Sequence, residues 1–226
     1  MKTFHIVGND DKTLQFFKEM ELPIVCAQEA DILVFSGQTE ISPTLYNEKR
    51  TYTKVEVPLS KTDIYETNMY YRFLDKEKIG IGRGAQLLFV MNGGRLWQQV
   101  NSHSSLQHKI YTDKKEQLVI TSQHHTMMRN DTNKKNPFEI LATSYIATHI
   151  KSEEMSQNIP RVNQTVLHNK ELEVVWFPKT STLCFQPLPQ ECLDKIPSDA
   201  AYTTCYYFFD LIEQKFNLKE DQKCVG

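Results

Sequence analysis

The chain has 226 residues, of which 40% are hydrophobic and 11% aromatic, enough to build the core of one large domain. Its formal net charge is −2 with acidic and basic residues interspersed, which argues against a nucleic-acid-binding surface or a basic membrane-binding face. No apolar run approaches the roughly 18 residues of a membrane span, and Asp10 and Asp11 interrupt the apolar N-terminus too early for a signal peptide.

Predicted strands and helices alternate in the first half of the chain. Residues 30–37 are almost continuously apolar, as expected for a strand buried on both faces. A helix is predicted over residues 62–76 from the spacing of Ile64, Met69, Tyr70 and Phe73. The remaining predicted elements are strands at 3–7, 54–59 and 78–82, and helices at 12–20 and 84–94. This alternation predicts a parallel sheet covered by helices.

The second half has a different pattern, with short strands separated by polar turns. Such a pattern is typical of antiparallel pairing. The predicted strands fall within residues 106–113, 116–122, 139–147 and 165–178, with one linker-like stretch at 152–164. A final helix is predicted over residues 199–216, with an apolar face formed by Tyr202, Cys205, Tyr206, Phe209, Leu211, Ile212 and Phe216. We therefore expect one α/β domain over residues 1–226, with an open, mostly parallel, doubly wound (flavodoxin-like) sheet.

The cysteines indicate the compartment. The chain has five of them, an odd number, and no C-x-x-C pairing. We therefore expect free thiols in a reducing cytoplasm. The histidines offer no H-x-H or H-x-x-x-H pair, so no metal site is expected, and no cofactor is indicated.

The sequence GIGRG, residues 80–84, follows a predicted strand and precedes a predicted helix. A dinucleotide-binding loop requires G-x-G-x-x-G, and here the third glycine comes one residue early, at Gly84. A purely structural tight turn is a second interpretation. The third is a nucleophile elbow, whose apex residue has a strained backbone and whose neighbours must be small, as Gly80 and Gly84 are. The apex would then be Gly82, which has no side chain to attack a substrate.

Five segments between residues 31 and 191 form an ordered set of motifs. They are DILVFSGQTEISPTLYNE (31–48), GIGRGAQLL (80–88), LWQQVNSHSSLQH (96–108), VITSQHHTMM (119–128) and CFQPLPQE (184–191). Together they resemble the motifs of class I glutamine amidotransferases, in particular the gamma-glutamyl-hydrolase-like branch and its phage-encoded members. A phage origin would imply the cytoplasm of the host cell.

The resemblance implies a Cys–His–Glu triad that hydrolyses a gamma-glutamyl amide. Carried across, the cysteine falls on Gly82, the histidine on Leu188 and the glutamate on Gln190, and none of these can perform the corresponding step. The Gly-Gly of the family's oxyanion loop corresponds to Gly37-Gln38, where the side chain of Gln38 opposes the required backbone movement. The sequence therefore predicts a catalytically inactive member of this fold.

Several polar residues that match the family could still bind a ligand. Gln86 lines the glutamyl pocket in the family, although it could instead hydrogen-bond a neighbouring strand. Arg83 follows the apex at a helix N-terminus, a position that favours anions, although it could pair with a surface carboxylate. The histidines that match the family, and that we expect near the mouth of the site, are His103, His108, His124 and His125. On a strand, the adjacent His124 and His125 would point to opposite faces.

Three functions remain open from the sequence. The first is an inactive protein that binds a gamma-glutamyl or nucleotide-like metabolite, or a protein partner. The second is an active gamma-glutamyl amide hydrolase or glutaminase with displaced residues such as Cys184, although a cysteine in an apolar strand is usually buried and inert. The third is a structural protein whose pocket has collapsed. The sequence does not indicate an oligomeric state.

Overall fold

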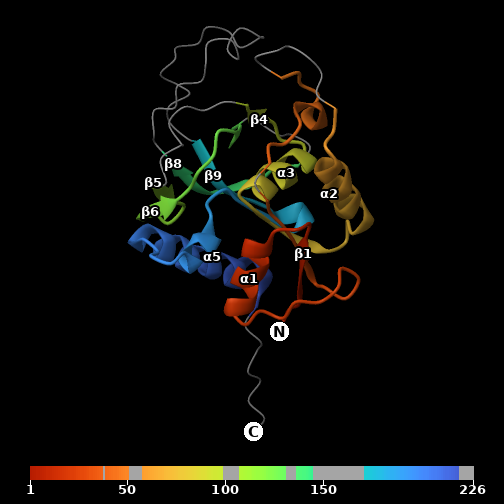
Figure 1. The fold of residues 1–226 in the computed structure, drawn as a ribbon. Helices are drawn as coiled ribbons and strands as arrows, with labels where there is room; N and C mark the ends of the chain where they lie inside the picture. The colour runs from red at the N-terminus through yellow and green to blue at the C-terminus, as the bar shows by residue number, and fades with distance from the viewer. Residues whose placement is uncertain (38, 51–57, 99–106, 131–135, 145–170, 219–226) are drawn as a thin grey trace, which may run out of the picture.

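An eight-stranded sheet forms the centre of the molecule (Figure 1). The computed structural model describes residues 1–37, 39–50, 58–98, 107–130, 136–144 and 171–218. The predicted strand at 54–59 and the linker at 152–164 fall wholly or largely outside these residues. In spatial order the strands are β1 (Phe4–Val7), β2 (Ile32–Phe35), β3 (Glu77–Ile81), β10 (Thr182–Phe185), β9 (Glu171–Phe177), β8 (Glu139–Ser144), β5 (Gln107–Thr112) and β6 (Gln117–Thr121).

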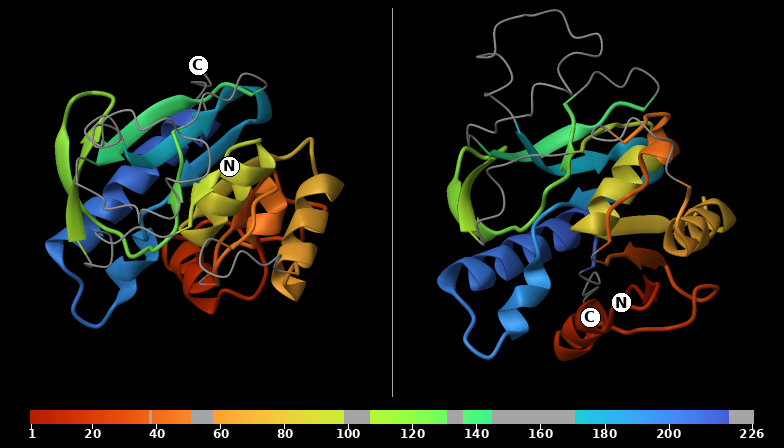
Figure 2. Two further views of the ribbon diagram at one scale, coloured as in Figure 1. Left: turned by 90° about the horizontal axis from the view of Figure 1, so that it is seen from above. Right: turned by 45° about the horizontal axis from the view of Figure 1, so that its top comes forward.

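The sheet is parallel at one side and antiparallel at the other. Strands β1, β2, β3 and β10 pair in parallel. The pairs β10–β9, β9–β8, β8–β5 and β5–β6 are antiparallel, so β9 and β5 run opposite to the other strands of the sheet. The β5–β6 hairpin lies at the edge far from α2 (Figure 2). The predicted mostly parallel sheet, with antiparallel strands in the second half, is confirmed.

Helices cover both faces of the sheet (Figure 1). Helices α1 (Asp11–Glu19) and α5 (Asp199–Phe216) pack with one hydrophobic core, whereas α2 (Lys61–Arg72) and α3 (Arg83–Met91) pack with the other. Local sequence signals start them: Asp10 caps α1, Ser60 caps α2 in a capping box with Asp63, and Ser198 caps α5. The fold is therefore the predicted doubly wound α/β arrangement.

The buried face of α2 includes the predicted Met69 and Tyr70, and the predicted Phe73 at its C-cap is buried as well, but Ile64 is not. Ile64 is 46% exposed, whereas the carboxylates of Asp63 and Glu66 are buried beside Met69 and Tyr70. The apolar spacing did not reveal the burial of the two carboxylates, because they pair with a buried arginine from another element, described below.

Helix α5 has the predicted bounds, although two members of its predicted apolar face lie outside the core. Tyr202 and Tyr206 are exposed, whereas Cys205, Leu211, Ile212 and Phe216 are buried with Tyr207 and Phe208. Among the described residues, no helix combines the length and the hydropathy that a membrane crossing requires.

A small second sheet lies beside the large one. It pairs β4 (Leu96–Trp97) with β7 (Met127–Met128) in antiparallel register. Met127 and Met128 are both buried, as expected for core residues. His124 and His125, which lie shortly before β7, are in a loop and not in a strand.

Candidate functional site

The turn between β3 and α3 is the centre of the candidate site. β3 ends at Ile81 and α3 begins at Arg83, so Gly82 alone makes the turn, with φ 54° and ψ −114°. Residues with side chains rarely adopt this conformation, which costs them about 1–3 kcal/mol. The backbone N–H of Gly82 donates to Phe185 O (2.9 Å), which fixes the turn against the end of β10.

The two flanking glycines are required by close backbone approach. A β-carbon at position 80 would lie 2.4 Å from Gly84 O, and one at position 84 would lie 1.9 Å from Phe35 O. Neither contact can be relieved by a side-chain rotation, because both are with backbone atoms. The expectation that small residues must flank the apex is confirmed, and it distinguishes this turn from an ordinary strand-to-helix connection.

Leu188 covers the apex of the turn. A β-carbon at position 82 would lie only 2.8 Å from Leu188 Cδ2, so the leucine occupies space that a side chain at the apex would need. The backbone of Leu188 is held in place by Thr121. Its N–H donates to Thr121 O (3.1 Å), and its carbonyl accepts from Thr121 Oγ1 (3.1 Å). The short 3-10 helix that follows, Pro189–Leu193, buries Gln190 nearby.

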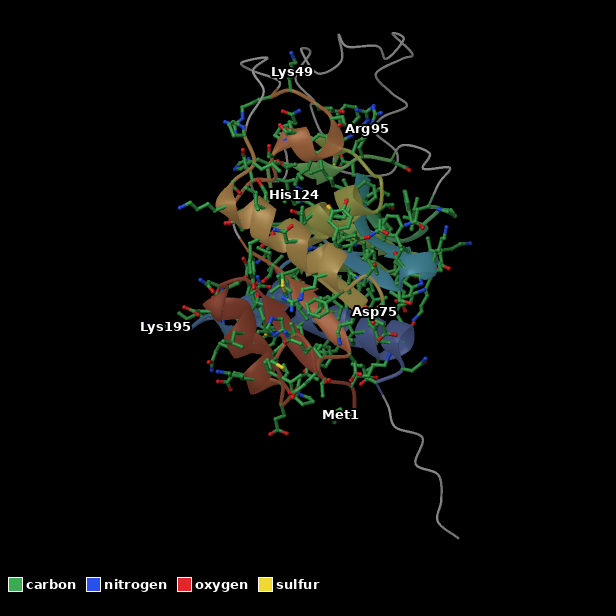
Figure 3. The ribbon with its side chains drawn as sticks, turned by 90° about the vertical axis from the view of Figure 1, so that its right-hand side faces the viewer. Met1, Lys49, Asp75, Arg95, His124 and Lys195 are labelled. Carbon is green, nitrogen blue, oxygen red and sulfur yellow. The ribbon has the colours of Figure 1, made fainter. Side chains whose placement is uncertain are left out.

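A cavity of about 350 Å³ lies over the turn, and we call it the elbow cavity. It lies at the carboxyl ends of β2, β3 and β10. In Figure 3, His124 lies toward this end of the molecule, whereas Met1 and Asp75 mark the end where β1 and β3 begin. The residues singled out from the sequence that line this cavity are Gly37, Gly82, Arg83, Gln86, His124, His125, Leu188 and Gln190. Gln38 and His103 lie outside the described residues.

The side chain of Arg83 extends from the cavity toward α2. Its guanidinium pairs with Asp63 (Nη2 to Oδ1, 2.7 Å) and with Glu66, and all three side chains are buried. Burial raises the pKa of Glu66, although the Arg83 charge opposes this effect. The alternative of a surface carboxylate partner is wrong, because both partners are buried. With two carboxylates beside one guanidinium, Arg83 brings little net positive charge to the elbow cavity.

Gln86 has a structural contact as well as a place in the cavity wall. Its Nε2 donates to Thr126 O (2.8 Å), which ties α3 to the loop before β7. The hydrogen bond expected as the alternative to a pocket role is therefore present, with a loop carbonyl as acceptor. Because the residue also lines the elbow cavity, the two roles are compatible.

The histidines divide into buried and exposed groups. His124 is buried, with Nδ1 3.0 Å from Thr126 O and Nε2 3.9 Å from Glu173 Oε2, whereas His125 is exposed. His108 lies on β5 with Nε2 2.9 Å from Glu173 Oε1 and does not line the elbow cavity. The buried Glu173 was missed from the sequence, where it appears as an ordinary residue of an alternating strand.

Two buried amide side chains, Gln186 and Gln190, belong to residues that line the elbow cavity. Gln186 and Gln190 are 2% and 8% exposed, and the Oε1 atom of each accepts no hydrogen bond within the described part of the chain. Glu191 also lines the cavity, and burial raises the pKa of its carboxyl group. The cavity wall is thus rich in oxygen acceptors, a feature that was not predicted.

Cys184, the candidate displaced nucleophile, is fully buried in β10, and burial raises the pKa of its thiol well above the ordinary value. It is not part of the elbow cavity wall. Within the described ranges, no group of three or more His, Cys, Asp or Glu side chains is arranged to hold a metal ion.

Comparisons with known proteins support the family and the fold. A family model described as Peptidase C26 matches residues 13–168. A protein from Thermoplasma acidophilum, provisionally described as one of the subunits of GMP synthase, has a similar structure, with a TM-score of 0.55, 12% identity and 96% of each chain covered. A glutamine amidotransferase from Thermotoga maritima is similar with a TM-score of 0.52 and 11% identity. The match covers 96% of this chain and 85% of the other. PurLQS from Thermotoga maritima is similar with a TM-score of 0.53 and 12% identity. The match covers 94% of this chain and 100% of the other. No curated protein sequence matched the chain.

Proposed function

Because the chain belongs to the peptidase C26 family and has a glutamine amidotransferase-like fold, we propose that it is a catalytically inactive member that binds a small polar molecule in the elbow cavity. The relationship between Gly82 and Leu188 carries this proposal. Covalent hydrolysis needs a nucleophile at the apex of the turn, and glycine provides none. Since Leu188 Cδ2 lies 2.8 Å from the position of a β-carbon at residue 82, a nucleophile at the apex would also have to displace the leucine side chain.

The other motif positions support the same proposal. In the register of the gamma-glutamyl-hydrolase-like branch, Leu188 stands where the histidine is expected and Gln190 where the glutamate is expected. A leucine cannot transfer a proton, and a neutral amide cannot stabilise an imidazolium. Three losses within one functional unit favour a relaxed site over a single accidental replacement.

A persisting cavity favours ligand binding over a purely structural role. Its volume of about 350 Å³ falls within the range of small-molecule sites. Although Leu188 covers the apex, it leaves Gln86, Gln186 and Gln190 in the wall. A collapsed pocket would have buried these amides against one another.

The polar atoms of the wall favour a ligand with N–H groups. The Oε1 atoms of Gln186 and Gln190 can each accept a hydrogen bond. A gamma-glutamyl amide carries both an ammonium and an amide N–H, so it has the required donors. The wall matches its carboxylate less well, because Arg83 is already paired with Asp63 and Glu66.

Hydrolysis by displaced residues is the weaker candidate. Cys184 is buried within the sheet, and a thiol with a raised pKa forms little thiolate at neutral pH. His124 is buried, with Nδ1 3.0 Å from Thr126 O and Nε2 3.9 Å from Glu173 Oε2, and the glycine at position 82 offers no nucleophile for it to activate.

Titration of the ¹⁵N-labelled protein with L-glutamine and with gamma-glutamyl-p-nitroanilide tests the proposal. We expect saturable shifts of amides around the elbow cavity, such as those of His125 and Leu188, without release of p-nitroaniline. Gln186→Leu should weaken binding about tenfold, the value of one hydrogen bond to a polar ligand. The exposed Gln28→Leu is the matched control and should bind as the wild type does. Absence of saturable shifts with both compounds would contradict ligand binding, and release of p-nitroaniline would contradict inactivity.

A further inference from the structure

A second cavity of about 520 Å³ lies at the carboxyl ends of β1 and β2. Its wall includes Val7, Asp10, Ser36, Lys61, Tyr65 and Arg83, and we call it the switch-point cavity. It shares Gly37, Thr39 and Arg83 with the elbow cavity, so the segment after β2 and the Arg83 side chain form a common wall between the two. No motif of the sequence pointed to it.

Chain topology explains why a cavity forms there. β1 and β2 are parallel neighbours, and the helices that follow them pack on opposite faces of the sheet: Phe16 and Phe17 of α1 join one core, whereas Met69 and Tyr70 of α2 join the other. Where successive helices leave a sheet in opposite directions, a crevice opens outside the carboxyl ends of the two strands. In doubly wound proteins such crevices are ligand sites. The switch-point cavity lies in this position.

Buried polar atoms in the wall lack partners among the described residues. Ser36 is 2% exposed and its Oγ has no hydrogen-bond partner within the described ranges; the same is true of Arg83 Nε, in a side chain only 3% exposed. Lys61 adds an exposed ammonium at the first residue of α2, next to the N–H groups of the helix N-terminus. Buried polar groups normally have partners, so these atoms point to a missing acceptor.

The acidic groups of the wall are already engaged. Asp10 caps α1, accepting from Thr13 N (3.2 Å) and Thr13 Oγ1 (2.8 Å). Glu66 pairs with Arg83. The groups left for a ligand are therefore mainly donors, and the neighbouring Val7 and the half-exposed Tyr65 add apolar surface.

We propose that the switch-point cavity binds a small metabolite with an oxyanion, a carboxylate or a phosphate, separately from the elbow cavity. The oxyanion accepts hydrogen bonds from Lys61 and Ser36 at the N-terminus of α2, and the rest of the metabolite packs against Tyr65. This proposal does not depend on whether the elbow turn is catalytic.

The test is a titration of the ¹⁵N-labelled protein with inorganic phosphate and, separately, with succinate, at constant ionic strength and up to on the order of 10 mM. We expect saturable shifts of the amides of Gly8, Asn9, Ser36 and Thr62, while those of His125 and Leu188 stay in place. The anion that saturates at the lower concentration identifies the class of oxyanion. A failure of the elbow cavity to bind its own ligands leaves this result unaffected.

Two variants make the result specific. Lys61→Ala, which leaves the Ser60 cap intact, should weaken binding about tenfold, as expected for one charge-assisted hydrogen bond. Lys18→Ala, at the exposed last turn of α1, is the matched control and should not change the affinity. The proposal is overturned if neither anion gives saturable shifts, if the shifts fall elsewhere, or if Lys61→Ala binds as tightly as the wild type.

Discussion

Leu188 and Gly82 are sterically linked, since a β-carbon at position 82 would lie 2.8 Å from Leu188 Cδ2. The backbone of the leucine is held by two hydrogen bonds with Thr121, so the contact can be relieved only by movement of its side chain. A side chain at the apex would therefore require the side chain of Leu188 to move. Under the proposed function, the glycine at the apex and the leucine at position 188 are two parts of one change in the site.

The first prediction concerns this contact. Gly82→Ala should destabilise the protein by at least the roughly 1–3 kcal/mol that a positive φ costs a residue with a side chain, because it adds the clash with Leu188. In a Leu188→Ala background the clash is removed and the cost should fall, while the backbone strain remains. Urea unfolding of the four proteins in this cycle gives the coupling. Equal costs in both backgrounds would show that the contact is absent.

The second prediction compares two glycines of the same turn. Gly84→Ala should be more damaging than Gly82→Ala, because its β-carbon would lie 1.9 Å from the backbone of Phe35 instead of meeting a movable side chain. We expect low yield of folded protein or a larger drop in the urea midpoint. A Gly84→Ala protein as stable as Gly82→Ala would contradict the close approach of α3 to β2.

The third prediction concerns the buried arginine. Arg83→Met leaves Asp63 and Glu66 buried without their cation, which typically costs about 3–5 kcal/mol. Because protonation removes the uncompensated charge, the loss should shrink as the pH falls toward the raised pKa of Glu66. Urea unfolding at neutral and mildly acidic pH measures both effects. Arg72→Met, on the exposed end of α2, is the control, and an equal loss in the two variants would contradict the buried cluster.

The fourth prediction concerns thiol reactivity. Cys26 is exposed, whereas Cys184 is buried with a raised thiol pKa. Iodoacetamide should therefore modify Cys26 in the native protein and reach Cys184 only after unfolding in urea. Peptide mapping by mass spectrometry distinguishes the two sites. Comparable native modification of both cysteines would revive Cys184 as a displaced nucleophile.

The fifth prediction is a pH dependence at Lys78. This residue of β3 is 1% exposed, and burial lowers its pKa to about 8. In the unfolded chain the pKa of Lys78 has its ordinary value of 10.5, so between about pH 8 and 10.5 the unfolded chain binds more protons than the folded protein. The stability of the wild type should therefore rise with pH across this window relative to that of Lys78→Met. Urea unfolding of both proteins at neutral pH and at about pH 10 measures the change. Lys18→Met is the control, and a constant difference between wild type and Lys78→Met would be contrary to this account.

Local sequence signals were sufficient for most of the elements and for the elbow. A continuous apolar run placed β2, and the spacing of apolar residues placed α5. Gly80 and Gly84 revealed the close approach of strand and helix, because glycine is the residue that such an approach allows. These features depend on neighbours within a few residues, which is why a sequence pattern can report them.

The missed features all depend on partners distant in the chain. The burial of Asp63 and Glu66 on α2 was missed because these carboxylates pair with Arg83, on another element. Glu173 was overlooked because its partners, His108 and His124, lie far earlier in the sequence. The contact of Leu188 with the apex follows from the parallel pairing of β10 with β3, a register that no local pattern specifies.

Turnover of gamma-glutamyl amides by the wild-type protein is the most direct test of the central claim. Ammonia release from L-glutamine and p-nitroaniline release from gamma-glutamyl-p-nitroanilide should not exceed the rates in buffer. The Leu188→Trp variant, which adds bulk to the wall of the elbow cavity, should give the same rates as the wild type. Turnover by the wild type that is abolished in Leu188→Trp would contradict the account, because it would show that the elbow cavity still performs hydrolysis without a side chain at Gly82.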